Sequence, residues 1–595
     1  MQRMNNRKLL FIAAASLVIV VTACFSPVFR AQFVNYDDDK MVYQNPKITE
    51  LSPQSVKLFF TSDYVGLYHP LVLLSYAIEH RFFRLDPAPY HVTNLCLHLC
   101  STLLVLWIAW MLSANVWVAF ITALLFGIHP LHVESVAWVS ERKDVLYAFF
   151  FLSSFAAYLS YRKKGSLAYY GASVVLFVMS LLSKPMAITL PLVLCLADFL
   201  TKRTWDRKAF IDKIVFFALA ALFAAATVMI HYTSGEISPR PPFAFWQKIF
   251  VAAYGFVFYI GKMLFPVKLS CIYPYPEDIY QRMPLLFLLS PLIAGTLFGL
   301  AAYSLRKTRV AAFGLLFYLV TVAPVLQFFP AGGEAVPADR YTYIPLLGLF
   351  YVIGAGIAGI ASRAATRRFI VPSVIAVFLI LAALTYRRCA VWHDSISLWD
   401  DVLKTRPRAA LAYSNRGAEY FLRKDYDRAL ADLRNALAIN PNAADVYNNR
   451  GVLYNEIGDF GRAVADFTQA IALKPGISHM YDNRGLAYYH QGDRAEALED
   501  FTEAIRLDPR NCTSHNNRGI LLSDNRDYKA AIADYDTAVR IAPRYADAYH
   551  NRAVAYFYMN DFDSAWRDLH KVRELGDKPT PRFLELLRQA SGRNE

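Results

Sequence analysis

Three consecutive aspartates, Asp37, Asp38 and Asp39, follow Tyr36 near the start of the chain, between two apolar regions. Adjacent carboxylates repel one another, which raises the pKa of at least one of them unless a cation lies close by. A carboxylate with a raised pKa can act as a general base and take a proton from a hydroxyl group. We therefore regard Asp37 and Asp38 as candidate catalytic residues, with His69 further along the same loop as another site candidate. A solvated loop or a helix cap is the alternative that these residues allow.

A second group of polar residues begins with the string HPLHVE at 129–134 and continues with WVSERKD at 138–144. Two histidines three residues apart, His129 and His132, can share one face of a helix and bind a metal ion together with Glu134. An open-ended histidine pair does not specify such a site. We therefore expect no metal, with a divalent metal at these three residues as the alternative.

Several cations stand at the ends of apolar stretches, where they suit a phosphate group held at the level of lipid headgroups. They are Arg142 and Lys143 in the second string, Lys184, and Arg340 in the string ADRYTYIP at 338–345. Tyr341 in the last string is a further site candidate. Anchoring at the membrane interface, for which Trp, Tyr and Arg are common, is the alternative role for these clusters.

Membrane helices are the elements that must position these residues. The chain of 595 residues is 56% hydrophobic and 18% charged, whereas soluble domains are about 25% charged. Apolar runs of roughly 17 to 25 residues are typical of spanning helices. They predict eleven spans, near 9-29, 90-112, 116-134, 144-161, 167-183, 186-201, 211-232, 285-305, 310-329, 343-361 and 369-386.

Short basic segments between the spans predict the orientation, because Lys and Arg are enriched on the cytoplasmic side of membrane proteins. These segments lie at 3–8, 162–164, 202–208, 306–309 and 363–368. With eleven spans all of them face the cytoplasm, so the N-terminus lies inside and the C-terminus outside. The apolar segment 249–265 would reverse the last two if it spanned, and we expect it to be a re-entrant or interfacial helix. The net charge of +14 thus indicates membrane topology and not nucleic-acid binding.

A 34-residue period begins after Arg408, which is the length of a helix-turn-helix tetratricopeptide repeat. Asn-Arg-Gly recurs at 415–417, 449–451, 483–485 and 517–519, with Asn-Arg-Ala at 551–553. Small residues at the third position of this motif allow the two helices of a repeat to approach. The predicted fold is all-α, with a polytopic membrane helix domain at 1-390, a linker helix at 391-409, five repeats at 410-579 forming a superhelix, and a capping helix and tail at 580-595.

Three ladders of identical residues follow this period. An arginine ladder and an aspartate ladder have matched spacing, which predicts an internal ion pair in each repeat. Their members are Arg416, Arg450, Arg484, Arg518 and Arg552, with Asp432, Asp466, Asp500, Asp534 and Asp568. An asparagine ladder should face the concave groove, where amides could hold an extended peptide by its backbone; hydrogen bonding between repeats is the alternative. Its members are Asn415, Asn449, Asn483, Asn517 and Asn551.

These strings and the trailing repeats together resemble the transmembrane and tetratricopeptide repeat-containing family, whose members resemble GT-C glycosyltransferases. The likeness covers essentially the whole chain, and HPLHVESVAWVSERKD at 129–144 is its most specific part. The family's paired acidic motif falls on Asp37 and Asp38. This chain continues the motif with Asp39 where relatives often have proline, so that either carboxylate is a candidate for the base.

The resemblance implies a membrane enzyme that transfers a mannose-like sugar from a polyprenyl-phosphate carrier to an acceptor hydroxyl, on protein, at the outer side of the membrane. Direct displacement at the anomeric carbon would make it an inverting GT-C-type glycosyltransferase. The lipid-linked sugar is the expected donor, with no other cofactor and no nucleic acid among the partners, and the repeat groove is expected to hold the acceptor peptide. Eukaryotic relatives use dolichyl-phosphate mannose.

The expected location is the plasma (inner) membrane of a prokaryote, with the repeats on the extracytoplasmic side, or the endoplasmic reticulum membrane in a eukaryote. The rival interpretation is a non-catalytic membrane-anchored tetratricopeptide scaffold that assembles envelope proteins. A tether needs only one span, and the charged external loops favour the enzyme. A transporter or flippase would need polar or broken helices at mid-membrane, for which Pro185 and Pro191 are the only indication.

Overall fold

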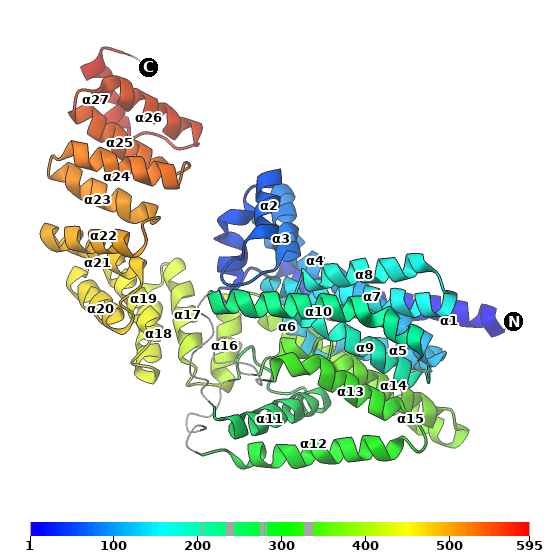
Figure 1. Ribbon diagram of the computed structural model, residues 1–595. Coiled ribbons are helices and arrows are strands. Elements are labelled where there is room, and N and C mark those ends of the chain that lie inside the picture. Colours follow the sequence, from blue (N-terminus) through cyan, green and yellow to red (C-terminus); the bar gives the residue numbers. More distant parts are fainter. Residues whose placement is uncertain are drawn as a thin grey trace. The chain divides into compact units, whose positions relative to one another are not determined.

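The computed structural model describes residues 2–203, 206–233, 243–273, 279, 282–326 and 337–593. These residues form helices, with one isolated antiparallel bridge between Tyr64 and Leu67. The chain divides into two compact units, Met1–Pro407 and Arg408–Glu595 (Figure 1). The division falls within the predicted linker 391–409. The end of the predicted span 310–329, part of the basic segment 202–208 and the last two residues of the predicted tail lie outside the described residues.

Among the described residues of the first unit, six helices are long and apolar enough to cross a membrane. They are α1 (Gln2–Cys24), α4 (Pro87–Ser113), α7 (Arg142–Lys164), α10 (Arg207–Thr233), α12 (Leu285–Ser304) and α15 (Ala364–Val391). A seventh candidate consists of α5 (Val116–Ile128) and the segment Pro130–Ala137, which includes α6 (Val133–Ala137) and is bent from α5 by 51°. With so many candidate spans the chain is an integral membrane protein.

Four shorter apolar segments accompany these helices: α8 (Leu167–Leu181), Pro185–Leu200 with α9 (Leu190–Leu200), Val310–Val325 with α13 (Val310–Val322), and α14 (Leu346–Ala361). The eleven predicted spans coincide in position with the six long helices, the bent pair and these four segments. Length and composition alone identify only six or seven of them, so the number of crossings stays a prediction. The helix α11 (Phe245–Leu264), which contains all but the last residue of the segment 249–265, is not among the candidate spans of the described chain.

Close contacts between small residues hold apolar helices of the first unit together, as is usual inside a membrane. A Cβ on Gly314 of α13 would lie 2.5 Å from the backbone oxygen of Gly348 in α14, so both positions need glycine. The hydroxyls of Ser154 in α7 and Ser173 in α8 each donate to the backbone oxygen of the other residue, at 2.7 and 2.8 Å. The serine contacts hold α7 against α8, and the WVSERKD string leads into the N-terminal end of α7.

The first loop has its own hydrophobic core. It contains α2 (Pro53–Thr61) and α3 (Pro70–Phe83), which stand across the direction of α7 and α10 in Figure 1. The core residues of this loop include Met41, Val42, Ile48, Phe59, Val72 and Tyr76, which pack with Val139, just before α7, and with Leu146 in its first turns. The loop that carries the three aspartates is therefore packed against α7 and is not simply solvated.

The second unit, as described over residues 408–593, contains five helix pairs and one further helix. The pairs are α17 (Ala410–Leu422) with α18 (Tyr426–Ile439), α19 (Ala444–Glu456) with α20 (Phe460–Leu473), α21 (Ser478–Gln491) with α22 (Arg494–Leu507), α23 (Cys512–Asp524) with α24 (Tyr528–Ile541), and α25 (Ala546–Tyr558) with α26 (Phe562–Glu574). The last helix, α27 (Pro581–Ser591), covers Trp566 and Leu569 with Phe583 and Leu587. The remaining helix of the first unit, α16 (Ser395–Thr405), lies in the predicted linker.

The repeats pack as the period predicts. A Cβ on Gly451 would lie 2.7 Å from the Phe467 ring, and a Cβ on Gly519 would lie equally close to the Tyr535 ring. The small residue of the motif therefore allows the first helix of each repeat to touch the second. The all-α prediction, an apolar helical membrane region followed by a tetratricopeptide superhelix, is confirmed.

Candidate active site

Asp38 is fully buried, and both of its carboxylate oxygens accept hydrogen bonds. Its Oδ1 accepts hydrogen bonds from the backbone N–H of Ser140 at 2.8 Å and from the Ser140 hydroxyl at 2.5 Å, and its Oδ2 accepts from the backbone N–H of Val34 at 2.9 Å. Burial raises the pKa of Asp38 to about 7, although these hydrogen bonds oppose the shift. With three donors already on its carboxylate, Asp38 ties the first loop to the segment before α7.

Asp37 is in a different position, half-buried at the surface of the same loop. Its backbone oxygen accepts from Met41, but no hydrogen bond within the described residues involves its carboxylate. Burial raises the pKa of Asp37, and the charges of Lys143, Lys40 and Arg340 partly oppose this rise. Asp37 therefore combines an available carboxylate with nearby cations, which Asp38 does not.

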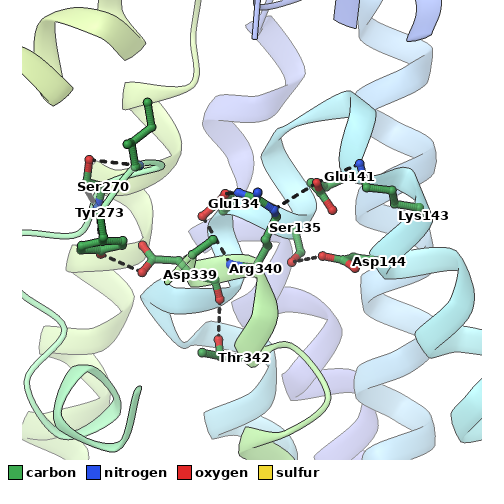
Figure 2. A network of polar contacts seen from close by, with 12 residues as sticks. Glu134, Ser135, Glu141, Lys143, Asp144, Ser270, Tyr273, Asp339, Arg340 and Thr342 are labelled. Carbon is green, nitrogen blue, oxygen red and sulfur yellow. Dashed lines mark hydrogen bonds and ion pairs between the residues drawn. The ribbon is translucent and has the colours of Figure 1, made fainter. Parts of the chain in front are cut away.

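Three of the predicted cations come together around buried acids. Figure 2 shows two of them, Arg340 and Lys143, with Glu134, Glu141 and Asp144. Arg340 lies in the short helix Asp339–Thr342, Lys143 lies in α7, and Lys184 precedes the short helix Pro185–Thr189. Arg340 Nη1 is 2.5 Å from Glu134 Oε1, and Lys184 is paired with Asp144. Segments far apart in the sequence thus form one cluster of charged side chains.

Glu141 connects the three cations. Its Oε1 is 3.0 Å from Lys143 Nζ and 3.4 Å from Arg340 Nε, and its Oε2 is 3.8 Å from Lys184 Nζ. The string ERKD contained this residue, but we did not predict it as a site residue. The sequence prediction also omits Asp144, which pairs with Lys184, and Asp339, which accepts a hydrogen bond from the Tyr273 hydroxyl.

Aromatic rings border this cluster. The guanidinium of Arg340 lies 5.5 Å and Lys143 Nζ lies 5.7 Å from the ring centre of Trp138. Tyr36 stacks on Trp138 with ring centres 4.5 Å apart and an interplanar angle of 13°. The ring of Tyr341 lies 5.0 Å from Arg340. Because Tyr36 directly precedes Asp37, this stacking positions the available carboxylate beside the cations.

Arg142 does not lie with the other cations. It is fully buried, and its guanidinium donates to Glu79 Oε1 at 3.1 Å, to the backbone oxygen of Tyr90 at 2.9 Å and to Asn94. The predicted role of Arg142 in binding a lipid phosphate therefore has no support in the geometry. Consecutive residues on a helix point about 100° apart, which is why Arg142 and Lys143 reach different surroundings.

His129 and His132 form hydrogen bonds with backbone atoms. His129 Nε2 bonds to the backbone oxygen of Met263 at 3.0 Å, and its Nδ1 accepts from the backbone N–H of Leu131 at 3.3 Å. His132 Nδ1 bonds to the backbone oxygen of Phe126 at 2.7 Å. Within the described chain, no group of three or more His, Cys, Asp or Glu side chains could hold a metal ion. Glu134 faces Arg340 and not the histidines.

His69 occupies the position before the first turn of α3 and is almost fully buried. Its Nδ1 has no hydrogen-bond partner within the described residues. Burial lowers the pKa of His69 to about 3, and the positive charges of Lys143 and Lys184 lower it further. His69 is therefore a neutral imidazole near the cation cluster at ordinary pH.

In the repeats, the predicted ion pairs are all present. Each ladder arginine donates through Nε and Nη2 to both oxygens of the aspartate in its own repeat, at 2.7 to 2.8 Å. The asparagine ladder is partly used between repeats, because Asn483 donates to Asn448 at 3.0 Å, Asn517 to Asp482 at 3.2 Å, and Asn551 to Asn516 at 3.0 Å. Three members of this ladder therefore form hydrogen bonds between repeats, which is the alternative role.

Comparisons with known proteins agree with this architecture. Models of the tetratricopeptide repeat match residues 417–458, 526–560, 480–511 and 444–477. The solved structure of YrrB, described as a TPR protein with an unusual peptide-binding site, is 19% identical, covers 33% of this chain and 98% of its own, and has a TM-score of 0.27.

Curated relatives match a larger share of the chain than the repeat unit alone. Protein O-mannosyl-transferase F38B6.6 of Caenorhabditis elegans is 22% identical over 64% of this chain and 56% of its own length. Protein O-mannosyl-transferase TMTC1 of Homo sapiens is 24% identical over 68% of this chain and 52% of its own, and TMTC3 of Homo sapiens is 22% identical over 70% and 50%. This chain thus spans about half the length of the curated relatives that it matches.

Candidate membrane spans, tetratricopeptide repeats and matches that extend beyond those repeats occur here in one chain. The chain is therefore a distant homologue of the TMTC-family protein O-mannosyl-transferases.

Proposed function

We propose that this protein is an integral-membrane glycosyltransferase that moves a mannose-like sugar from a polyprenyl-phosphate carrier to a hydroxyl group of an acceptor protein. The observation that carries the proposal is the available carboxylate of Asp37 beside Lys143 and Arg340. Distant homology to the protein O-mannosyl-transferases supports the same reaction class.

In the proposed reaction, the acceptor oxygen attacks the anomeric carbon of the sugar while Asp37 takes the hydroxyl proton. The bond between the anomeric carbon and the phosphate oxygen breaks, and its electron pair stays on the phosphate, which leaves as polyprenyl phosphate. Because the attack and the departure occur on opposite sides, the anomeric centre is inverted. Of the two predicted bases, Asp37 is the one whose carboxylate is not already occupied by three hydrogen-bond donors.

The leaving phosphate needs positive charge, because a developing oxyanion is stabilised by cations fixed in advance. Lys143, Lys184 and Arg340 would supply it, with Tyr341 beside Arg340. We leave Arg142 out of this group, because all of its contacts lie in the protein interior. His69 would border the site as a neutral side chain.

The acceptor would approach through the repeats. The amide oxygens of Asn483 and Asn517 would accept hydrogen bonds from the backbone N–H groups of an extended peptide, since their amide nitrogens are used between repeats. The Asn551 side chain is also hydrogen-bonded to His550. Asn415 and Asn449 complete the ladder in sequence. We place the site and the repeats on the extracytoplasmic side of a prokaryotic plasma membrane, or on the corresponding side of the endoplasmic reticulum membrane in a eukaryote.

The test is transfer of radiolabelled mannose from polyprenyl-phosphate mannose in membranes that contain the protein. Wild-type protein should label acceptor protein, and the Asp37→Asn variant should not. A non-catalytic scaffold, the rival interpretation, would give no label above membranes without the protein. Other polyprenyl-phosphate sugars, assayed in parallel, identify the sugar.

A further inference from the structure

We infer that Glu141 is the positioning residue that holds Lys143, Lys184 and Arg340 in place for the phosphate of the lipid-linked donor, an inference that rests on the proposed function. The string ERKD alone does not distinguish this acid from its neighbours. The contacts within the cluster distinguish Glu141 from the other acids.

Glu141 is the acid that contacts all three cations. Lys143 comes from α7, Lys184 from the segment after α8, and Arg340 from the short helix before α14, and each reaches the Glu141 carboxylate within 3.8 Å. The other acids of the cluster each hold a single cation, since Glu134 pairs with Arg340 and Asp144 pairs with Lys184. Three like charges drawn from separate segments repel one another unless an anion lies between them.

The relative burial of these groups shows on which side the phosphate would bind. The Glu141 side chain is 1% exposed, whereas those of Lys143, Lys184 and Arg340 are 13%, 11% and 17% exposed. The carboxylate is therefore closed to solvent, whereas each cation keeps a small accessible side. A phosphate would bind to these accessible sides without displacing Glu141.

The state of the carboxylate fits this role. Although Glu141 Oε2 is buried, it has no hydrogen-bond partner within the described residues. Glu141 contacts the three cations as an anion between them, so both its negative charge and the reach of its side chain should matter for donor binding.

The experiment compares Glu141→Gln with a matched control at the other end of α7. Asp198 is also a buried carboxylate with three cations, Lys213 at 2.5 Å, Arg162 at 2.6 Å and Arg203 at 3.5 Å. Since α7 has 23 residues and a helix rises 1.5 Å per residue, the two carboxylates are separated by roughly 30 Å. The Asp198→Asn variant thus removes the same charge from a similar cluster far from Asp37.

Two quantities are measured on the full chain in detergent: the Kd for polyprenyl phosphate, and the KM and kcat for transfer from polyprenyl-phosphate mannose. We expect Glu141→Gln to raise the Kd and the KM about tenfold or more with a smaller change in kcat, and Glu141→Asp to raise them less because the charge is kept. Asp198→Asn should leave both unchanged even if it lowers the Tm.

An unchanged Kd in Glu141→Gln, or an equal rise in Asp198→Asn, would overturn the inference. If Glu141→Gln does not accumulate, Glu141→Asp decides, with an unchanged Kd again counting against the inference. If the wild-type protein binds polyprenyl phosphate but transfers no sugar, the proposed function fails while the Kd values still test Glu141. If the wild-type protein does not bind it, both fail.

Discussion

The Asp38 carboxylate and Ser140 are joined by two hydrogen bonds across 102 residues of sequence, one from the backbone N–H and one from the hydroxyl. This contact fastens the acidic loop to the segment that leads into α7. It also distinguishes the two adjacent aspartates, because Asp38 is committed to the fold while Asp37 is left available.

Replacing Ser140 with alanine should therefore destabilise the protein without removing the proposed base. Loss of a buried hydrogen bond to a carboxylate costs about 2 kcal/mol. We expect Ser140→Ala and Asp38→Asn to lower the Tm of the detergent-solubilised protein, whereas Asp37→Asn leaves it nearly unchanged. Thermal unfolding followed by intrinsic fluorescence measures this, and equal Tm losses for Asp37→Asn and Asp38→Asn would contradict the assignment.

The pKa of His69 predicts how the stability depends on pH. Burial lowers this pKa from 6.5 to about 3, so the unfolded chain binds a proton below pH 6.5 that the folded protein does not bind until about pH 3. The stabilisation is therefore present above pH 6.5 and is lost as the pH falls toward 3. The stability difference between wild type and His69→Gln should change by about 1.4 kcal/mol per pH unit below pH 6. Parallel stability curves for the two proteins between pH 6 and pH 4 would show that His69 is not a buried neutral imidazole.

The repeats could be predicted closely from sequence because their contacts are local and recur. Arg416 and Asp432 are 16 residues apart, and the same pair returns in each repeat, so that matched spacing alone identified the partners. The close approach at Gly451 follows from the same period.

The candidate site could be predicted only in part, because its contacts join distant segments. The string ERKD does not show that Arg142 turns toward Glu79 while Lys143 turns toward Glu141. Neither could the sequence separate Asp37 from Asp38, since their difference depends on Ser140. The roles of His129 and His132 likewise depend on backbone oxygens, which no side-chain pattern reveals.

The arginine ladder and the asparagine ladder of the repeat unit should respond differently to substitution. Arg484 binds both oxygens of the buried Asp500, so Arg484→Ala leaves an unpaired charge and should cost about 3 kcal/mol or more. Asn483→Ala removes one amide hydrogen bond to Asn448 and should cost about 1 kcal/mol. Thermal melts of residues 408–595 measure both, and the reverse order would mean that the ladders are assigned backwards.

The predicted orientation can be tested with a reporter that is active only in the cytoplasm. Fused after Arg588, the reporter should be inactive, because the five basic segments place the repeats outside. Fused after Lys164, in one of those segments, it should be active. High activity after Arg588 would place the repeats in the cytoplasm and would rule out an extracytoplasmic acceptor.

The most direct test of the proposed function is to measure sugar transfer and donor binding separately in two variants. Asp37→Asn keeps the size and polarity of the side chain but cannot accept the proton, so transfer from polyprenyl-phosphate mannose should fall about 100-fold to 10,000-fold while donor binding is retained. Arg340→Ala should lose both, because a cation on the phosphate contributes to binding and to departure of the leaving group. Undiminished transfer by the Asp37→Asn protein would contradict the proposed mechanism.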